Sequence, residues 1–305
     1  MLRYDDLQVF VHTSDSGSLS AAARQLEISP AVASAALKRL ESELEVRLFA
    51  RSTRSLRLTP EGDAFLLHAR ASLRSLEEGR RLLQGGKDQI AGVLQLSAPS
   101  DFGRNLLLPW LDEFQARYPQ LSLRLLLGDL TDLYRQPVDV AIRYGAPADS
   151  SLVALPLAPD NRRVLCAAPG YLAERGEPRQ PDDLREHNCL LYQLGGRVHD
   201  RWAFQRGRRS LTLTVAGDRV CDDADVVRRW ALAGKGLVYK SWLDVAEDVR
   251  AGRLRLLLPE WQGEATPMNL LCTHRAQLTR PVTLLRAFVR ERCDALLAEA
   301  PWTRN

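Results

Sequence analysis

Two short helices joined by a tight turn constrain the fold of this chain more than any other feature of its sequence. Ser29 and Pro30 start the second of them, because serine caps a helix and proline fits its first position. This helix is predicted to run to about Leu44. An alanine-rich helix over residues 19–26 comes before it, and a stripe of apolar residues around Phe10 predicts one earlier helix. The pattern is that of a helix-turn-helix.

The outward face of the third helix carries small side chains and one cation. These residues follow each other at spacings of three and four, so they share one side of the helix: Ala31, Ser34, Ala35 and Lys38. Such a surface can enter the major groove of DNA, where hydroxyl, methyl and ammonium groups can contact base edges or phosphates. The alternative is a small three-helix packing module with solvated charges.

Four arginines follow within eleven residues, at positions 47, 51, 54 and 57. They are interleaved with leucine and phenylalanine, which predicts a short hairpin with arginines on its rim, placed as a wing over phosphates. Residues 1–62 carry eight basic and eight acidic side chains. The argument for DNA binding therefore rests on where the charges lie and not on their sum.

Residues 3–62 resemble the DNA-binding domain of the LysR-type transcriptional regulators. The resemblance is carried, in order and without gaps, by SGSLSAAARQL (16–26), SPA (29–31), LKRLE (37–41), LFAR (48–51) and LTPEG (58–62). In that family the third helix enters the major groove and the wing follows the DNA backbone. This implies DNA contacts for Ser29, Ala31, Ser34, Lys38, Arg51 and Arg54.

Two positions depart from the pattern of that family. Glu45 stands where a glycine usually ends the recognition helix, and a left-handed cap is less favourable without glycine. We therefore expect the wing to enter at an altered angle. Ala35 stands where many members carry a long polar side chain, which shifts weight from direct base contacts toward DNA shape.

Residues 61–91 are predicted to form a linker helix that pairs two copies of the chain. A seam of apolar residues at alternating spacings of three and four, interrupted at Arg80, is typical of a short coiled coil: Leu66, Ala69, Leu73, Leu76 and Leu83. The alternative is an amphipathic helix lying on its own domain. The family resemblance also implies pairing, so we expect a homodimer or homotetramer on an operator with two half-sites.

After Gly92 strands alternate with helices, which predicts an α/β domain with a mainly parallel sheet. Strands are expected at 93–98, 121–127, 138–142, 164–168, 211–215, 236–239 and 268–273, and helices at 105–117, 223–233 and 281–297. The strand at 268–273 is expected to return to the first block. Two lobes joined by two crossings form a cleft, which suits a small ligand.

This region is similar to the LysR effector domain, which has the fold of the type II periplasmic binding proteins. The similarity rests on APS (98–100), Phe114 with Tyr118-Pro119, DVAIR (139–143), PGYL (169–172) and AGKG (233–236). The predicted domains are a winged helix-turn-helix (1–60), a linker helix (61–91) and a two-lobed α/β effector domain (92–300). Lobe I covers about 92–162 and 268–300, and lobe II about 163–267.

The resemblance implies an effector pocket between the lobes. Carried over by position, its candidate residues are Ser100, Phe102, Asp129, Thr131, Arg143, Tyr144, Gln193, Trp202, Asp222 and Lys240. Arg143 and Lys240 are suited to hold a carboxylate, and Tyr144 and Trp202 to form aromatic walls. We therefore expect a small anionic organic effector. The alternative for each residue is a surface charge or a core aromatic.

Five cysteines, odd in number and without a CxxC pair, predict neither a zinc site nor a disulfide framework. Buried reduced thiols are the simplest interpretation. A thiol-based redox sensor of the same family is the alternative, with Cys189 and Cys221 as its candidate pair. Asp222 and Asp223 disfavour that alternative, because they raise the pKa of the neighbouring thiol.

Other classes of protein are disfavoured by what the sequence lacks. It contains no catalytic motif of the GxSxG, HExxH, Walker or GxGxxG kind, and its five histidines show no metal-ligand spacing. We expect no enzyme, no metal and no cofactor. No apolar run could span a membrane and no signal peptide is evident, so a cytoplasmic location is expected. A regulator of this kind can also contact RNA polymerase. A remaining alternative is a purely structural DNA-binding protein whose C-terminal domain serves only assembly, and the two-lobed pattern argues against it.

Overall fold

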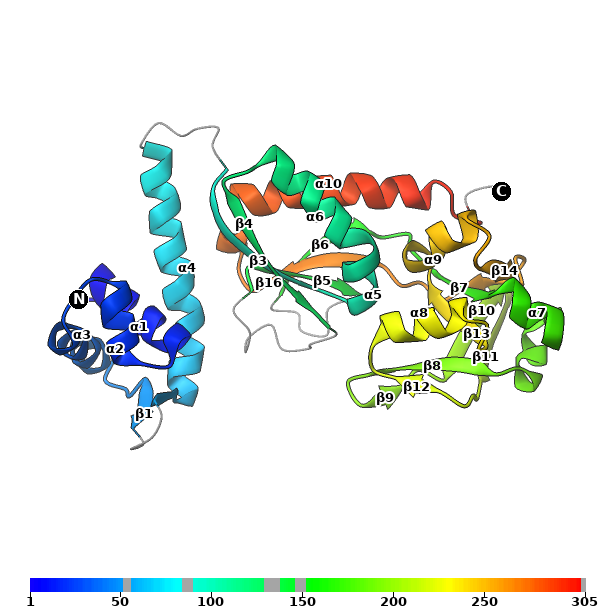
Figure 1. Ribbon diagram of the computed structural model, residues 1–305, viewed down its shortest axis with the longest axis horizontal. Coiled ribbons are helices and arrows are strands. Elements are labelled where there is room, and N and C mark those ends of the chain that lie inside the picture. Colours follow the sequence, from blue (N-terminus) through cyan, green and yellow to red (C-terminus); the bar gives the residue numbers. More distant parts are fainter. Residues whose placement is uncertain (52–55, 84–89, 129–137, 146–151, 303–305) are drawn as a thin grey trace. The chain divides into compact units, whose positions relative to one another are not determined.

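Figure 1 shows the computed structural model of the chain, which describes residues 1–51, 56–83, 90–128, 138–145 and 152–302. The chain divides near residue 90 into two compact units. The first contains the predicted helix-turn-helix and the linker helix, and the second contains the two lobes.

The first unit is a winged helix-turn-helix. Its elements are α1 (Tyr4–Ser16), α2 (Leu19–Gln25), α3 (Pro30–Glu43), β1 (Phe49–Arg51), β2 (Leu56–Leu58) and α4 (Pro60–Leu83). Ser18 and Ser29 cap α2 and α3 as predicted. Phe10 is fully buried at the centre of the core, where its ring meets Phe49 of the wing edge to face at 5.6 Å.

The linker helix α4 divides its apolar seam between two environments. Leu66 and Ala69 are buried in the core of the first unit, so this half of the helix lies on its own domain. Leu76, further along, is 58% exposed. The alternative of a helix lying on its own domain thus holds for the first half of α4, and pairing of its second half with a second chain stays a prediction.

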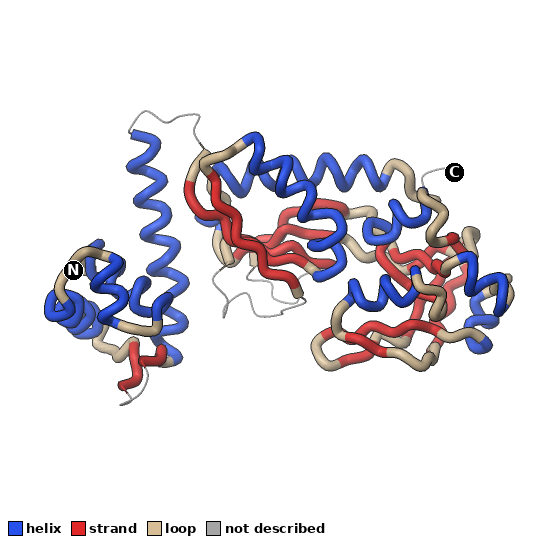
Figure 2. The backbone as a smooth tube through the Cα atoms, in the orientation of Figure 1, coloured by secondary structure: helices blue, strands red, loops and turns tan. Residues whose placement is uncertain are grey.

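Lobe I is built on a five-stranded sheet, which Figure 2 shows as a red layer under blue helices. Its order is β4 (Leu121–Leu127), β3 (Gly92–Ala98), β5 (Val140–Tyr144), β16 (Met268–Cys272) and β6 (Val153–Ala158). The helices are α5 (Ser100–Phe102), which runs through a π-helical turn (Gly103–Leu107) into α6 (Leu108–Arg117), and α10 (Arg280–Leu297). Phe114 of α6 and Phe288 of α10 pack against each other, with ring centroids 5.4 Å apart.

Lobe II contains two sheets. The larger has the order β12 (Val220–Cys221), β8 (Cys189–Leu194), β13 (Leu237–Ser241), β7 (Arg163–Ala167) and β14 (Arg255–Leu257), with β9 (Arg197–Val198) paired to β8. The smaller has the order β11 (Arg209–Thr214), β10 (Arg201–Arg206) and β15 (Gln262–Gly263). The helices of this lobe are α7 (Pro169–Arg175), α8 (Ala224–Leu232) and α9 (Trp242–Arg250), with a 3-10 helix at Pro181–Glu186. A second 3-10 helix, at Arg275–Gln277, lies in lobe I between β16 and α10.

The predicted return of the strand near residue 268 to lobe I is confirmed, because β16 pairs with β5 and β6. Both of these pairings are antiparallel, so β6 runs in the same direction as β5, β3 and β4, and the sheet is mainly parallel as predicted, with β16 running the other way. The reason is that β16 enters lobe I from lobe II, against the direction of the strands that begin in lobe I. The strands β6, β8 and β10 were missing from the prediction, since short apolar runs such as CLLYQL give no clear period.

Candidate functional site

The recognition helix α3 presents the predicted face to solvent. Ala31, Ala35 and Lys38 are exposed and Ser34 is half-buried, while the opposite side of the helix lies in the core. Ser29 is exposed and its hydroxyl accepts a hydrogen bond from the backbone N–H of Val32 at 3.2 Å. The cap therefore fixes the first turn of the helix just where its outward face begins.

Glu41 fixes the wing to the recognition helix. Its carboxylate is buried and accepts hydrogen bonds from the backbone N–H groups of Leu48 at 2.9 Å and Phe49 at 3.3 Å. Arg47 donates to its other oxygen at 2.8 Å. Such charge-assisted bonds are short and strong, so the strand β1 has a defined position relative to α3. In the sequence Glu41 stands out only as the last residue of the LKRLE motif (37–41).

The LTPEG segment (58–62) joins the wing to the linker helix, and the two elements pack closely against each other there. The Thr59 hydroxyl donates to the carbonyl of Arg47 at 2.6 Å and accepts from the N–H of Gly62 at 3.0 Å. A Cβ atom on Gly62 would lie 2.1 Å from the carbonyl oxygen of Leu48. Only glycine allows this approach of helix and strand.

Glu45 adopts the left-handed conformation that its position requires, with φ 56°. The N–H of Val46 then donates to the carbonyl of Glu41 at 3.2 Å, which closes the end of α3. The usual helix end is thus formed without glycine. An altered entry of the wing stays a prediction. Of the predicted wing contacts, Arg54 and the side chain of Arg51 lie outside the described residues.

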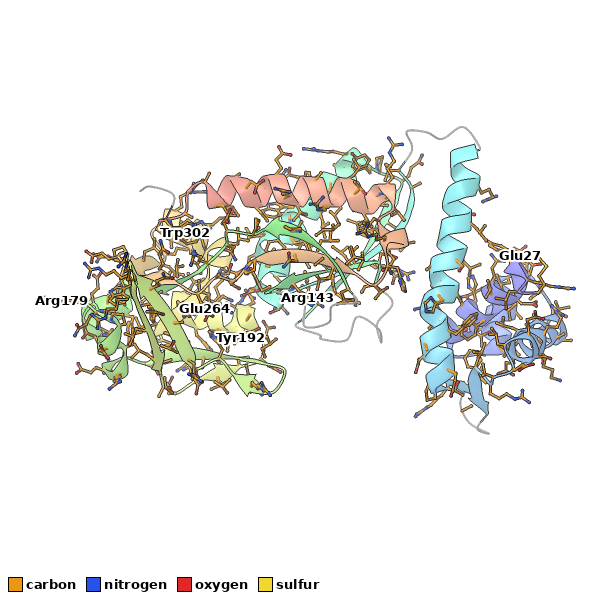
Figure 3. The ribbon with its side chains drawn as sticks, turned by 180° about the vertical axis from the view of Figure 1, so that it is seen from behind. Glu27, Arg143, Arg179, Tyr192, Glu264 and Trp302 are labelled. Carbon is orange, nitrogen blue, oxygen red and sulfur yellow. The ribbon has the colours of Figure 1, made fainter. Side chains whose placement is uncertain are left out.

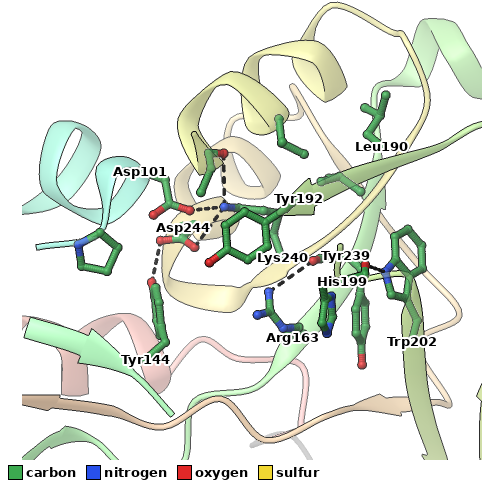
Figure 4. A pocket seen from close by; sticks show the side chains of 14 residues that line it. Asp101, Tyr144, Arg163, Leu190, Tyr192, His199, Trp202, Tyr239, Lys240 and Asp244 are labelled. Carbon is green, nitrogen blue, oxygen red and sulfur yellow. Dashed lines mark hydrogen bonds and ion pairs between the residues drawn. The ribbon is translucent and has the colours of Figure 1, made fainter. Parts of the chain in front are cut away.

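In the second unit, a cavity lies between the lobes (Figure 4). Of the predicted pocket residues, Tyr144, Trp202 and Lys240 line it. The space free inside is about 20 Å³, against roughly 10–15 Å³ needed for one water molecule. In this conformation the cavity is therefore too small for an organic effector, which would require side chains or lobes to move.

A buried ion cluster joins the lobes across this cavity. The ammonium of Lys240, on β13, contacts the carboxylate of Asp101, on α5, and lies 3.6 Å from that of Asp244, on α9. All three side chains are at least 95% buried. Tyr144 of lobe I donates its hydroxyl proton to Asp244 at 2.7 Å. The cluster thus connects β5 and α5 of lobe I with β13 and α9 of lobe II.

The two carboxyl groups of this cluster differ in pKa. Burial raises the pKa of Asp244 to about 8, and the nearby charge of Asp101 adds to the effect. Burial acts on Asp101 in the same direction, but the charge and hydrogen bond of Lys240 outweigh it and lower its pKa. At neutral pH Asp101 is therefore the charged partner of Lys240, and Asp244 holds a proton.

A second group of polar side chains lines the lobe II wall and was missed by the sequence argument. Arg163 and His199 both contact the carboxylate of Glu264, at 2.7 and 2.9 Å. The Tyr239 hydroxyl accepts from the N–H of Glu264 at 2.6 Å, and its ring stacks on Trp202 with centroids 5.2 Å apart. These residues come from β7, β10, β13 and the segments beside them, so no local spacing could have grouped them.

The start of α8 forms a further contact between the lobes. Asp223 accepts hydrogen bonds from the hydroxyl of Ser100 at 2.8 Å and from Arg104 at 2.8 Å. Asn105 donates to Asp225 at 2.8 Å. Ser100, a predicted pocket residue, does not line the cavity in this conformation, and its hydroxyl is bonded to Asp223 of lobe II.

The remaining predicted pocket residues lie elsewhere. Phe102 is fully buried in the core, edge to face with Trp110, which corrects its assignment to the pocket. Arg143, labelled in Figure 3, donates to the hydroxyl of Ser97 at 2.8 Å. Gln193 pairs with Val198, and Asp222 is exposed beside Cys221; neither lines the cavity in this conformation. Asp129 and Thr131 lie outside the described residues.

The cysteines form no disulfide, and four of the five are buried. Burial raises the pKa of Cys189 to about 12. Cys221 lies opposite Tyr192 of β8, and Cys189 is three residues away along that strand, roughly 10 Å. A disulfide requires Cα atoms within about 7 Å, so this pair cannot join without a rearrangement of the lobe.

A winged helix-turn-helix with an exposed recognition face, followed by two α/β lobes around a cleft, defines a DNA-binding protein with a ligand-binding domain. Comparison with known families agrees. Residues 4–63 match the family described as "Bacterial regulatory helix-turn-helix protein, lysR family", and residues 87–294 match "LysR substrate binding domain". The chain belongs to the LysR family of transcriptional regulators.

Named relatives cover nearly the whole chain. The HTH-type transcriptional regulator DmlR of Escherichia coli is 32% identical over 90% of this chain and 88% of its own length. The transcriptional activator AaeR of the same species is 32% identical over 93% and 92%. The solved structure of CrgA, a LysR-type regulator from Neisseria meningitidis, is 31% identical, covers 94% of this chain and 98% of its own, and has a TM-score of 0.59.

Among the residues that the structure describes, no helix is long and apolar enough to cross a membrane. Within the same residues, no three histidine, cysteine or acidic side chains form a group that could hold a metal ion.

Proposed function

We propose that this protein is a sequence-specific transcriptional regulator whose DNA binding is controlled by a small organic effector bound between the two lobes. The recognition helix carries this proposal. Its small outward face, its capped first turn and the wing fixed through Glu41 together form a surface that fits a major groove and the flanking phosphates. Ser29, Ala31, Ser34, Lys38, Arg51 and Arg54 are the proposed DNA contacts.

We propose a carboxylate as the effector's recognition group. Lys240 is a buried cation at the wall of the cavity, and its charged partner in this conformation is the carboxylate of Asp101, beside the Ala224 carbonyl at 3.4 Å. Tyr144 and Trp202 supply aromatic walls beside it. Arg143 contributes less support than expected, because its guanidinium is already bonded to Ser97.

We further propose that the chain acts in the cytoplasm as a homodimer or homotetramer on an operator with two half-sites. The exposed Leu76 on α4 supports this, since an apolar seam beyond the domain's own core is suited to pair with a second copy. Contact with RNA polymerase is part of the same proposal. The separation of Cys189 and Cys221 does not support the redox alternative. The residues that line the cleft do not add support for a catalytic role.

The proposal is tested by selecting duplexes from a random DNA pool with the purified full-length protein at near-physiological salt. Recovery of a two-fold symmetric site is the expected result. Recovery of sequences without a shared site would contradict it. A Ser34→Ala, Lys38→Ala double variant is the control, because its folding core is intact and its selected site should weaken or disappear.

A further inference from the structure

The contact between Asp101 and Lys240 joins two segments that are 139 residues apart in the sequence. Asp101 lies in the first turn after β3 of lobe I, and Lys240 lies on β13 of lobe II. Each is at least 95% buried, so neither end of the pair is solvated. Separation of the lobes therefore requires this pair to break.

The charges of the described cavity residues are balanced. Arg163 is bonded to Glu264, and Lys240 is bonded to Asp101. His199 also contacts Glu264, and Asp244, whose pKa is raised to about 8, accepts a hydrogen bond from the Tyr144 hydroxyl. An added anion would have no cation left to bind, and an unpaired buried charge is costly. An anion that takes the place of Asp101 avoids this cost, because one carboxylate replaces another and the released one becomes solvated.

We propose that Asp101 is a built-in competitor of the effector for Lys240, and that the pair latches the two lobes until a carboxylate displaces Asp101. The proposal rests on the proposed effector function and specifies how that site is regulated. Ser100 and Arg104 flank Asp101 and bind Asp223 on lobe II. Release of Asp101 thus loosens the adjoining contact at the start of α8.

The latch is tested without ligand by hydrogen exchange of the full-length protein. Asp101→Asn removes the charge that bridges the lobes, so amides of residues 100–107 and 237–244 should exchange at least about tenfold faster. Asp244→Asn is the matched control: it leaves the Asp101–Lys240 pair in place, and exchange in both segments should stay within a factor of about two. Equal exchange in the Asp101→Asn protein and the wild type would overturn the latch.

A second variant covers the case in which an unpaired Lys240 prevents folding. Asp101→Ala with Lys240→Met removes both charges, so that no buried charge is left unpaired, and it shortens the lobe I side chain so that no new apolar contact replaces the ion pair. The same acceleration in the two segments is expected. If amide exchange in the two segments is no faster in this variant than in the wild type, the latch is overturned.

Competition is tested with benzoate and benzamide, which share a shape and differ in charge. Asp101→Asn with Asp244→Asn frees Lys240 from both carboxylates, so its Kd for benzoate should fall at least about tenfold below that of the wild type. Its Kd for benzamide should not change, and adding Lys240→Met should abolish the gain. The competition is overturned if this double variant binds benzoate no more tightly than the wild type does. Absence of benzoate binding in both proteins counts as the same result. Neither readout uses DNA, so failure of the DNA-binding proposal would be seen separately.

Discussion

The two units place their ion pairs differently relative to the surface that is proposed to bind a ligand. The first unit keeps them away from that surface, and the effector unit has them within it. In the first unit Arg39 binds the buried Asp6 and Arg47 binds Glu41, and these pairs hold the recognition helix from behind or from its end. Lys38, on the outward face, is exposed. In the effector unit the pairs formed by Lys240 and Arg163 line the cavity itself.

This difference follows from the ligand that each surface is proposed to bind. DNA is long and highly charged, so its protein partner needs an exposed face that is ready before contact. A small effector has to be enclosed, and its site has to be held in some state while it is absent. The DNA-binding unit therefore separates structural charges from functional ones, whereas in the effector unit the same charges serve both purposes.

The largest effect is expected from Lys240→Met. It leaves Asp101 buried without its cation, and breaking such a pair costs about 3–5 kcal/mol. All six tryptophans lie after residue 90, so urea unfolding followed by tryptophan fluorescence reports the effector unit alone. A loss under about 1 kcal/mol would mean that the pair behaves like a surface salt bridge and that the two units do not differ in this way.

Gly62→Ala should destabilise the first unit instead. The added methyl meets the Leu48 carbonyl, and such overpacking costs about 1–3 kcal/mol or more. Gly79→Ala is the control in the same helix, because nothing lies within 4 Å of its Cβ position, and it should stabilise the helix by about 0.5–1 kcal/mol. Hydrogen exchange in α1 and α3 measures both. Equal effects of the two substitutions would refute the close approach.

Lys38→Ala should weaken binding to a selected operator by about 1–3 kcal/mol. Lys235→Ala removes the same charge from an exposed position of the effector unit and should leave operator binding unchanged. Fluorescence anisotropy at constant salt measures both affinities. If both variants lose the same affinity, net charge and not the helix face governs binding.

A further prediction concerns pH. The pKa of Asp244 is about 8 in the folded state and about 3.9 in an unfolded chain, so between these values only the folded state holds its proton. The free energy of unfolding should therefore fall as pH rises through this window, by up to about 1.4 kcal/mol per pH unit. Asp101, whose pKa is lowered, adds a dependence only at acidic pH.

Urea unfolding of the wild type and Asp244→Asn at pH 5.5 and 8.5 isolates this contribution. The wild type should lose more stability than the variant between the two values. Parallel losses would show that Asp244 does not hold the proton.

Predictability from the sequence also differs between the units. The caps at Ser18 and Ser29 and the outward face of α3 follow from spacings within one turn or two, so they could be predicted. The cleft depends on contacts such as Ser100 with Asp223, which are 123 residues apart. Lys240 was identified as a pocket residue, but its partner Asp101 was not, because no local pattern shows which carboxylate the fold brings to it. Phe102 was misplaced for the same reason, since its burial depends on Trp110 and on the sheet beneath.

The central claim is that the exposed face of α3 reads a specific DNA sequence. The most direct test measures the affinity of the full-length protein for the selected operator and for a scrambled duplex of equal length, at about 0.15 M salt. The account predicts a ratio of at least about 10³ in favour of the operator. A ratio near one, with both affinities falling equally as salt rises, would show phosphate binding alone and contradict it.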